Sequence, residues 1–536
     1  MTIEWKIGQM LVFGWTGASS EEQTTVSDHA REIILDAQVG SVVLLGRNIA
    51  DDLTVTAHTL NELQSLSKEP LLVAADQEGG MVARFVDGVT VFPSNMALGA
   101  TRSPDFAYRA AAATADELTA IGVNHNYAPC VDVNNNPANP IIGTRSYGES
   151  PQLVSEFAVH AVRGYQDRGV IACAKHFPGH GDTAVDSHLA LPIVSYPRER
   201  LDEVELVPFR AAIAAGIDSI MTTHIMFPSL DPERPSTLSP RIIDGLLRSE
   251  LGFDGVVVTD CMEMKAIADT WGTAEAAVMA VEAGVDLVLV CHTREVQRAV
   301  REAILKAVRD GRISEARLDQ SVRRIMALKN KYSLNARRYS DPSKLGEVLR
   351  KKAHLELRRD TALRSTTLAK NDLGVVPLSS GARVLVAGLH WTVGPLAEAV
   401  GRYAGSVETL QVEDSDGIER AIRAAGNADA VIVPVAPHEP WRARVDQALQ
   451  AGLVESLDGS GKPLVVVAVR EPYILGRFAG VSTQLCTYGY CEGMLEAAAD
   501  VIFGRARPVG ILPVTLGGPP AVRSEGKPTA EVPQYF

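Results

Sequence analysis

The chain has 536 residues, 46% of them hydrophobic and 22% charged, with a formal net charge of -13. This length exceeds the usual size of one domain, so we expect two or more domains with separate cores. The acidic balance without a long basic run argues against nucleic acid or an anionic membrane as partner, and no apolar run approaches the ~20 residues of a membrane span.

Short apolar runs rich in Val, Ile and Leu alternate with longer segments of helical period through the first 300 residues. This alternation is typical of a parallel α/β architecture. Helices are expected over segments such as 106–121, 201–215 and 294–308. Eight runs are expected to be strands, namely 8–14, 39–45, 71–75, 123–129, 170–174, 219–223, 255–259 and 286–290. Eight strand and helix units predict a closed, TIM-like (β/α)8 barrel, for which about 250 residues is typical.

Polar side chains come directly after several of these runs. Asp76 follows the third run, Lys175 and His176 follow the fifth, His224 the sixth and Asp260 the seventh. The active sites of (β/α)8 barrels lie at the carboxyl ends of the strands. We therefore expect these side chains to gather at one mouth of the barrel.

The stretch 175–188 combines three histidines and two aspartates within fourteen residues, directly after an apolar run. Asp186 and His188 are two residues apart, so in an extended backbone they point the same way and can share a hydrogen bond. A carboxylate beside an imidazole favours the protonated ring, which makes His188 a candidate acid. Asp260, at the end of a buried strand, is the candidate nucleophile.

The second half of the chain begins with a basic helical stretch after about residue 332, and a new set of apolar runs follows it. These runs, which predict an open doubly wound sheet, are 384–388, 407–412, 430–435, 464–469 and 484–488. No GxGxxG or GxxxxGK[ST] fingerprint follows them, so we expect no nucleotide site there. The predicted organisation is a barrel over 1–335, a helical linker over 336–375 and an α/β sandwich domain over 376–536.

The first residues carry no positive leader followed by an apolar core, so we expect no secretory signal and a cytosolic location. No pair or group of cysteines has the spacing of a zinc knuckle, and we expect buried free thiols rather than disulfides. The six cysteines are scattered along the chain at Cys130, Cys173, Cys261, Cys291, Cys486 and Cys491.

Several motifs together resemble the two-domain β-N-acetylglucosaminidases of glycoside hydrolase family 3. The motifs are Asp-Gln-Glu-Gly-Gly at 76–80, the Asn-Pro to Tyr-Gly segment at 139–148, the loop 175–188 and Gly-Phe-Asp-Gly-Val-Val-Val-Thr-Asp at 252–260. A later stretch, 504–516, resembles the end of the second domain of that family. The resemblance covers nearly the whole chain and implies a glycoside hydrolase built from a barrel and an α/β sandwich domain.

The resemblance also implies a role for individual residues. Asp260 would form a glycosyl-enzyme, His188 would act as acid and base, and Asp186 would be its partner, in a double displacement that retains configuration. No cofactor and no metal are implied, and the substrate would carry terminal β-linked GlcNAc, as in cell-wall fragments or chitin oligomers. The residues expected to bind the sugar are Asp76, Arg145, Lys175, His176, His224 and Met264.

Some residues admit a second interpretation. His180 and Asp182 are expected to brace the loop, and His292 to be structural. Asp132 and His224 fit the barrel rim as well as the sugar pocket. Glu263, three residues after Asp260, could compete as the nucleophile, although its place at a helix start is the simpler explanation. The list of departures from the family is short and consists of Met81, where many relatives have Arg, and Cys261, where a second Asp is common.

Three other functions stay open at this point. A phosphorylase could use the same site, because a neutral histidine does not repel an incoming phosphate as a carboxylate would. A metal-dependent barrel hydrolase would take its ligands from His176, His180, Asp182 and His188, although this spacing fits no standard zinc motif. A sugar-binding protein without catalysis would not require Asp260.

Overall fold

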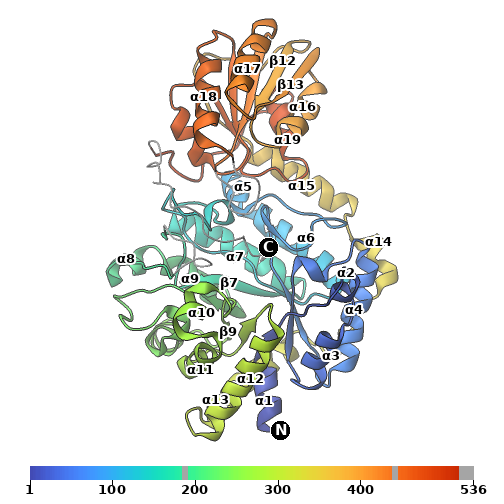
Figure 1. Ribbon diagram of the computed structural model, residues 1–536, viewed down its shortest axis with the longest axis vertical. Coiled ribbons are helices and arrows are strands. Elements are labelled where there is room, and N and C mark those ends of the chain that lie inside the picture. Colours follow the sequence, from blue (N-terminus) through green and yellow to red (C-terminus); the bar gives the residue numbers. More distant parts are fainter. Residues whose placement is uncertain (184–190, 438–444, 518–536) are drawn as a thin grey trace.

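The computed structural model describes residues 1–183, 191–437 and 445–517. The chain forms an eight-stranded barrel and a smaller domain with a six-stranded sheet, which is stacked on one side of the barrel (Figure 1). Helix α15 (Lys352–Ser365) lies at the junction of the two parts, where it contacts α5 (Asn95–Ala100) of the barrel. The prediction of a TIM-like barrel followed by a second α/β domain is confirmed.

All eight expected barrel strands are present. They are β1 (Leu11–Phe13), β2 (Ser41–Leu44), β3 (Leu72–Ala75), β6 (His125–Asn126), β7 (Ile171–Phe177), β8 (Ser219–Thr222), β9 (Val256–Val258) and β10 (Val288–Val290). The sheet order β10-β1-β2-β3-β6-β7-β8-β9 is parallel throughout. A parallel bridge between Val258 and Leu287 closes the ring. Every residue of these strands is buried, as an apolar run in the middle of a helix-covered sheet must be.

Helices surround the barrel and connect its strands (Figure 1). The helix expected over 201–215 is divided into α8 and α9, because Pro208 lacks a backbone N–H and fits only within the first turn of a helix. The helices of this part are α1 (Ile3–Gln9), α2 (Ser20–Thr24), α3 (Asp28–Leu35), α4 (Leu53–Leu66), α5, α6 (Pro104–Ile121), α7 (Pro151–Asp167), α8 (Arg198–Glu203), α9 (Leu206–Ala214), the π-helix η4 (Arg241–Glu250), α10 (Lys265–Trp271), α11 (Thr273–Ala283), α12 (Arg294–Arg309) and α13 (Glu315–Lys331).

The second domain is a doubly wound sheet, as expected. Its helices are α16 (Val393–Gly401), α17 (Ser415–Asn427), α18 (Gln447–Asp458) and α19 (Met494–Ile502), and α14 (Leu345–Val348) precedes it with α15. Its strands are β12 (Arg383–Gly388), β13 (Ser406–Gln411), β14 (Ala430–Val435), β15 (Leu464–Ala468), β16 (Thr483–Cys486) and an additional strand, β11 (Thr367–Asn371). The order is β11-β16-β15-β14-β12-β13, with β11 antiparallel to β16.

Strand β11 falls within the stretch that was expected to be a helical linker. Four of its five residues are only partly buried, because it lies at the edge of the sheet. An edge strand of this kind carries no apolar run, so it could not be recognised from the pattern of hydrophobic residues.

The second domain buttresses a loop of the barrel. Asn134 donates a hydrogen bond to the Tyr473 hydroxyl at 2.7 Å, and that hydroxyl donates to the Asn134 carbonyl at 3.2 Å. The Asn134 side-chain oxygen accepts from the amide of Gly143 at 3.1 Å. Gly143 has a φ of 44°, and a Cβ there would lie 2.7 Å from a carboxylate oxygen of Glu471, so this close approach requires glycine. The domain contact therefore shapes the loop that leads to Arg145.

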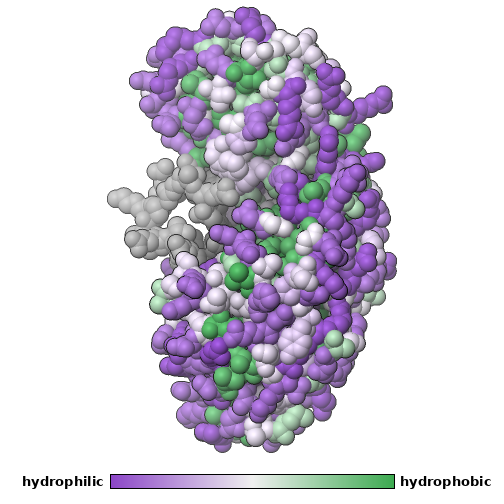
Figure 2. Space-filling view, turned by 90° about the vertical axis from the view of Figure 1, so that its right-hand side faces the viewer, coloured by the Kyte–Doolittle hydropathy of each residue, from purple (hydrophilic) through white to green (hydrophobic). Residues whose placement is uncertain are grey.

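Hydrophilic residues cover most of the face shown in Figure 2, and the hydrophobic residues on it form small separate groups. None of the helices in the described ranges is long and apolar enough to cross a membrane. All six cysteines are free thiols, five of them buried, as expected.

A buried lysine lies at the base of the barrel. Lys329 on α13 is 1% exposed, and its ammonium donates to the side-chain oxygen of Gln9 at 2.9 Å. Burial lowers the pKa of Lys329 from 10.5 to about 7, and the negative charge of Glu69 offsets burial only in part. Between these two pKa values the unfolded chain holds a proton that the folded chain has lost.

We predict that Lys329→Met stabilises the protein most at and below neutral pH. The cost of the buried ammonium is present in full below about pH 7 and disappears as the pH rises towards 10.5, because unfolding takes up a proton in that window. The shift from 10.5 to about 7, at about 1.4 kcal/mol per pKa unit, limits the gain to about 5 kcal/mol, less the lost contact to Gln9. Melting temperatures near pH 6 and near pH 9.5 test this. Lys331→Met, a partly exposed lysine of the same helix, is the control, and an advantage that did not shrink with rising pH would contradict the assignment.

Candidate active site

A cavity of about 110 Å³ lies at the carboxyl ends of the barrel strands. A larger, open groove of about 820 Å³ lies near the amino-terminal start of β9, where ion pairs such as Arg324 with Asp254 fill its rim. The chemistry-bearing side chains gather in the smaller cavity, so we take it as the site. Its lining includes Asp76, Arg84, Tyr127, Ile141, Arg145, Lys175, His176, His180, Met221, Asp260, Cys261, Glu263, Met264, Cys291 and His292.

A cluster of paired charges forms one wall. The ammonium of Lys175, at the end of β7, lies 2.6 Å from Asp76 and 2.7 Å from Glu78. Arg145 donates to both carboxylate oxygens of Glu78, at 2.8 and 2.9 Å. Arg84 donates to the second oxygen of Asp76 at 3.1 Å. Each charge in the cluster therefore has at least one opposite charge in contact.

The pairing keeps this cluster ionised. Burial alone raises the pKa of Asp76 and of Glu78, but the neighbouring cations outweigh burial and hold both pKa values below the usual range. Burial lowers the pKa of Lys175, but the two carboxylates outweigh it and raise that pKa. The wall therefore presents fixed, charged hydrogen-bonding groups to the cavity at neutral pH.

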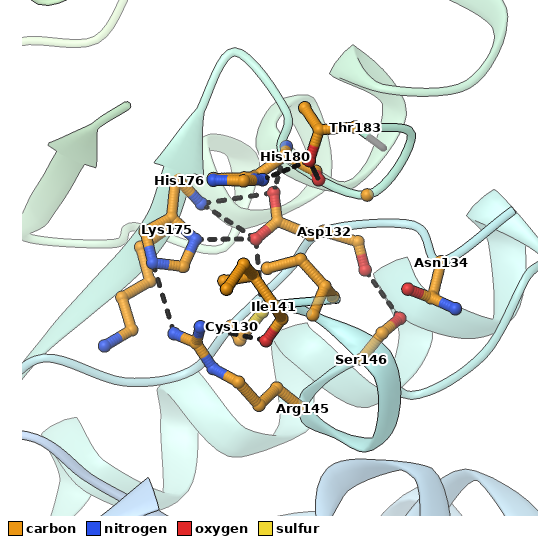
Figure 3. A network of polar contacts seen from close by, with 12 residues as sticks. Cys130, Asp132, Asn134, Ile141, Arg145, Ser146, Lys175, His176, His180 and Thr183 are labelled. Atoms are coloured by element: carbon orange, nitrogen blue, oxygen red, sulfur yellow. Dashed lines mark hydrogen bonds and ion pairs between the residues drawn. The ribbon is translucent and has the colours of Figure 1, made fainter. Parts of the chain in front are cut away.

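Asp132 is the centre of a second network, shown in Figure 3. Its carboxylate accepts hydrogen bonds from the ring Nδ1 of His176 at 2.7 Å, the His176 amide at 3.2 Å and the His180 amide at 2.6 Å. The bond at Nδ1 assigns the proton to that nitrogen, so Nε2 of His176 faces Arg145, 3.2 Å away, as an acceptor. Burial raises the pKa of Asp132, but its contacts with His176 outweigh burial and lower it. Asp132 therefore orients the imidazole and the loop.

The first part of the loop after β7 is held from below by Asn139. Its amide donates to the carbonyls of His180 at 2.8 Å and Gly181 at 3.0 Å. A Cβ at Gly181 would lie 1.8 Å from the Val133 carbonyl, so only glycine permits this contact. The ring of His180 contacts the Thr183 hydroxyl at 2.9 Å, and burial lowers its pKa to about 4. His180 is thus neutral and braces the loop while it also lines the cavity.

Asp260 follows β9 and is partly buried in the cavity wall, where its Oδ1 accepts from the amide of Cys261 at 2.7 Å. His224 is fully buried behind it, with ring nitrogens 2.9 Å from the Thr237 hydroxyl and 3.0 Å from the Cys261 carbonyl. Glu263 accepts from the backbone amide of His292 at 2.6 Å and of the next residue at 2.9 Å, just before α12. Glu263 itself stands directly before the N-cap of α10, as expected for a helix start, and its carboxylate in addition holds the backbone before α12.

The structure brings most of the expected site residues together and separates one of them. Asp186 and His188 lie outside the described residues. His224 is buried without lining the cavity. The roles of all of these remain predictions. The expected residues that line the cavity are Asp76, Arg145, Lys175, His176, Asp260 and Met264.

Three further residues of the site were not singled out from the sequence: Arg84 and Tyr127 line the cavity, and Glu78 belongs to the charged cluster behind that lining. Glu78 stands within the motif at 76–80, so that motif could have indicated it. Arg84 places a guanidinium beside Asp76 even though position 81 is Met, and nothing in its spacing indicates this. Tyr127 is fully buried, and its hydroxyl has no hydrogen-bond partner among the described residues. Such a hydroxyl is available to a sugar hydroxyl or a water molecule.

Two groups of described residues have ligand atoms close enough to hold a metal ion. One consists of Cys130, Asp132 and His176, whose imidazole and carboxylate already bond to each other. The other consists of Cys261, Cys291 and His292. The set expected for a metal-dependent hydrolase does not form such a group in the part of it that is described.

Comparisons with known proteins cover both parts of the chain. Residues 2–328 match the glycosyl hydrolase family 3 N terminal domain, and residues 366–528 match the glycosyl hydrolase family 3 C-terminal domain. The chain is 32% identical to beta-hexosaminidase A of Pseudoalteromonas piscicida over 94% of its length and 93% of that protein. It is 32% identical to a beta-N-acetylglucosaminidase/beta-glucosidase of Cellulomonas fimi, over 89% and 88%. A family 3 beta-N-acetylglucosaminidase structure from Paenibacillus sp. str. FPU-7 superposes with a TM-score of 0.89 at 39% identity, covering 96% of this chain and 99% of that one.

We predict that Asp132→Asn destabilises the barrel by about 3 kcal/mol, because the new amide group would point an N–H at the N–H groups of His176 or His180. A lower melting temperature would show this. Asp182→Asn on the same loop is the control, since its carboxylate is partly exposed and 3.8 Å from Arg200. Equal melting temperatures for the two variants would mean that Asp132 does not hold the loop.

Proposed function

The chain belongs to glycosyl hydrolase family 3 and is a glycoside hydrolase, and from this premise we propose that it is a retaining exo-β-N-acetylglucosaminidase. Its substrates would be oligosaccharides of cell-wall or chitin type with a terminal, non-reducing β-linked GlcNAc. The activities named for its hexosaminidase relatives support this choice of sugar. A cytosolic place of action is part of the proposal and agrees with six free thiols.

The observation that carries the proposal is the position of Asp260. Its carboxylate shares one small cavity with the charged wall formed by Asp76, Lys175 and Arg145. The cavity is small, about 110 Å³, and this favours action on one terminal sugar residue at a chain end. A nucleophile beside fixed donors and acceptors is what a glycosidase needs.

The reaction we propose has two steps. In the first, a carboxylate oxygen of Asp260 attacks the anomeric carbon while the leaving oxygen takes a proton from His188 and departs. In the second, His188 removes a proton from water, which attacks the same carbon and releases Asp260. Asp186 would partner the imidazole in both steps. Two displacements at one carbon retain its configuration.

The charged wall would hold the sugar during these steps. Lone pairs of Asp76 remain for sugar hydroxyls beside its contacts with Lys175 and Arg84, and His176, which lines the cavity and is held by Asp132, would contact the sugar from the same side. Met264, 7% exposed, would cover an apolar part of the ring. For His224 we propose a positioning role, since its ring holds the Cys261 carbonyl next to the nucleophile.

The test of the function is NMR of the sugar released from an aryl β-N-acetylglucosaminide. We expect free GlcNAc that appears first as the β anomer, with and without phosphate in the buffer. The α anomer as first product would rule out double displacement. Sugar 1-phosphate that forms only when phosphate is present would identify a phosphorylase. No observation on the described residues favours that activity.

The proposed roles of Asp260 and His188 can be distinguished by substrates whose leaving groups differ in basicity. Asp260→Ala should lower the turnover of every glycoside at least about 10⁴-fold, because no covalent intermediate can form. His188→Ala should slow substrates with basic leaving groups about 10²–10⁴-fold and spare those with very acidic ones, which need no proton. The kcat values of a series of aryl glycosides measure this. Equal losses across the series would remove the acid role of His188.

A further inference from the structure

A group of metal-binding side chains lies on the cavity wall that the proposed reaction does not use. Cys261 directly follows Asp260, and Cys291 and His292 follow β10 on the neighbouring side of the barrel closure. All three line the cavity, and their ligand atoms lie within 4.8 Å of one another. A thiol pair with an imidazole is a donor set suited to thiophilic cations.

The surroundings of the two thiols favour a cation. A carboxylate oxygen of Glu263 lies 4.0 Å from the Cys261 sulfur. The contact with Cys261 and burial raise the pKa of the Cys291 thiol, and the negative charge of nearby Glu263 adds to this effect. A positive ion between the two sulfurs and this carboxylate would be attracted by all three groups.

We propose that Cys261, Cys291 and His292 bind one thiophilic divalent cation of the Zn²⁺ type, and that this ion blocks the catalytic cavity. Metal–sulfur and metal–nitrogen bonds of about 2.3 and 2.0 Å put tetrahedral ligand atoms ~3.3–3.8 Å apart. The ligand atoms of the three residues would have to approach one another by about 1 Å to reach these distances. The fourth position opens towards the cavity, where water or Glu263 completes the set. Binding releases the two thiol protons.

Arg47 is the one cation in contact with this group in the described chain. It donates to Nδ1 of His292 at 3.2 Å and to the Cys291 carbonyl at 2.9 Å. An ion on that nitrogen replaces the longer of these two bonds and leaves the other. Two thiolates and Glu263 carry three negative charges, against three positive charges from the ion and Arg47. The filled site is therefore neutral overall.

A bound ion stands beside the nucleophile, because Cys261 is the next residue after Asp260. It attracts the Asp260 carboxylate and occupies space in a cavity of about 110 Å³. The ion is therefore an inhibitor of the reaction. This inhibition rests on the proposed function, whereas the binding itself does not.

Binding is tested with Cd²⁺, which forms an ultraviolet charge-transfer band with thiolates, on the reduced, metal-free, full-length protein. We expect one ion per chain, loss of the band in Cys291→Ser and an affinity at least about 10-fold lower in His292→Ala. Cys491→Ser, a cysteine of the second domain, is the matched control and should keep the full band. A band that survives in Cys291→Ser, or the absence of any band in the parent, overturns the proposal.

Inhibition is tested with Zn²⁺ on aryl glycoside turnover, each variant being compared with its own metal-free rate. The parent should lose its activity over the concentration range in which Cd²⁺ binds and regain it with a chelator. Cys291→Ser should need at least about 10-fold more Zn²⁺ for the same loss. Binding without inhibition would refute the blocking role. A parent that binds Cd²⁺ but hydrolyses no glycoside would refute the proposed function and leave the metal site standing.

Discussion

The buried ion pairs of Lys175 are the interaction on which the site depends. An ammonium group that is 2% exposed is stable in a protein only if opposite charges contact it directly, and Asp76 and Glu78 do so. These partners come from the segment after β3, whereas Lys175 lies near the end of β7, so the charges meet only when β3, β6 and β7 pair in register. Asp260, after β9, lines the same cavity as Asp76 and Lys175. Fold and site are therefore held by one set of contacts.

The second domain extends this dependence beyond the barrel. Tyr473 binds Asn134, and Asn134 binds Gly143, two residues before Arg145. Arg145 in turn neutralises Glu78, which shares its charge with Lys175. A chain of hydrogen bonds and ion pairs thus runs from the doubly wound sheet to the cavity, and it gives the second domain a structural task in the site.

The sequence predicts the barrel well because its strands are buried on both faces and read as apolar runs that end in polar groups. Strand β11 has an exposed edge and gave no such signal. Among the site residues, Lys175 and Asp260 could be placed because strand ends share one mouth. The position of Arg84 beside Asp76 and that of His224 behind Asp260 could not be predicted, since the partner of a side chain is set by tertiary packing. Asp132 fitted two interpretations, and its three N–H contacts decide for an orienting role.

The closure between β9 and β10 differs from the other joints of the barrel. It has one bridge, between Val258 and Leu287, with backbone hydrogen bonds such as Thr259 N–H to the Leu287 carbonyl beside it, and the Leu289 amide bonds to the Thr259 hydroxyl. Asp260 and Cys261 lie on one side of this seam, and Cys291 lies on the other. A ligand that joins the two sulfurs therefore also links the two strands that close the barrel. A metal that inhibits the enzyme would at the same time stabilise its fold, so the inhibited form would be the longer-lived one in a cell.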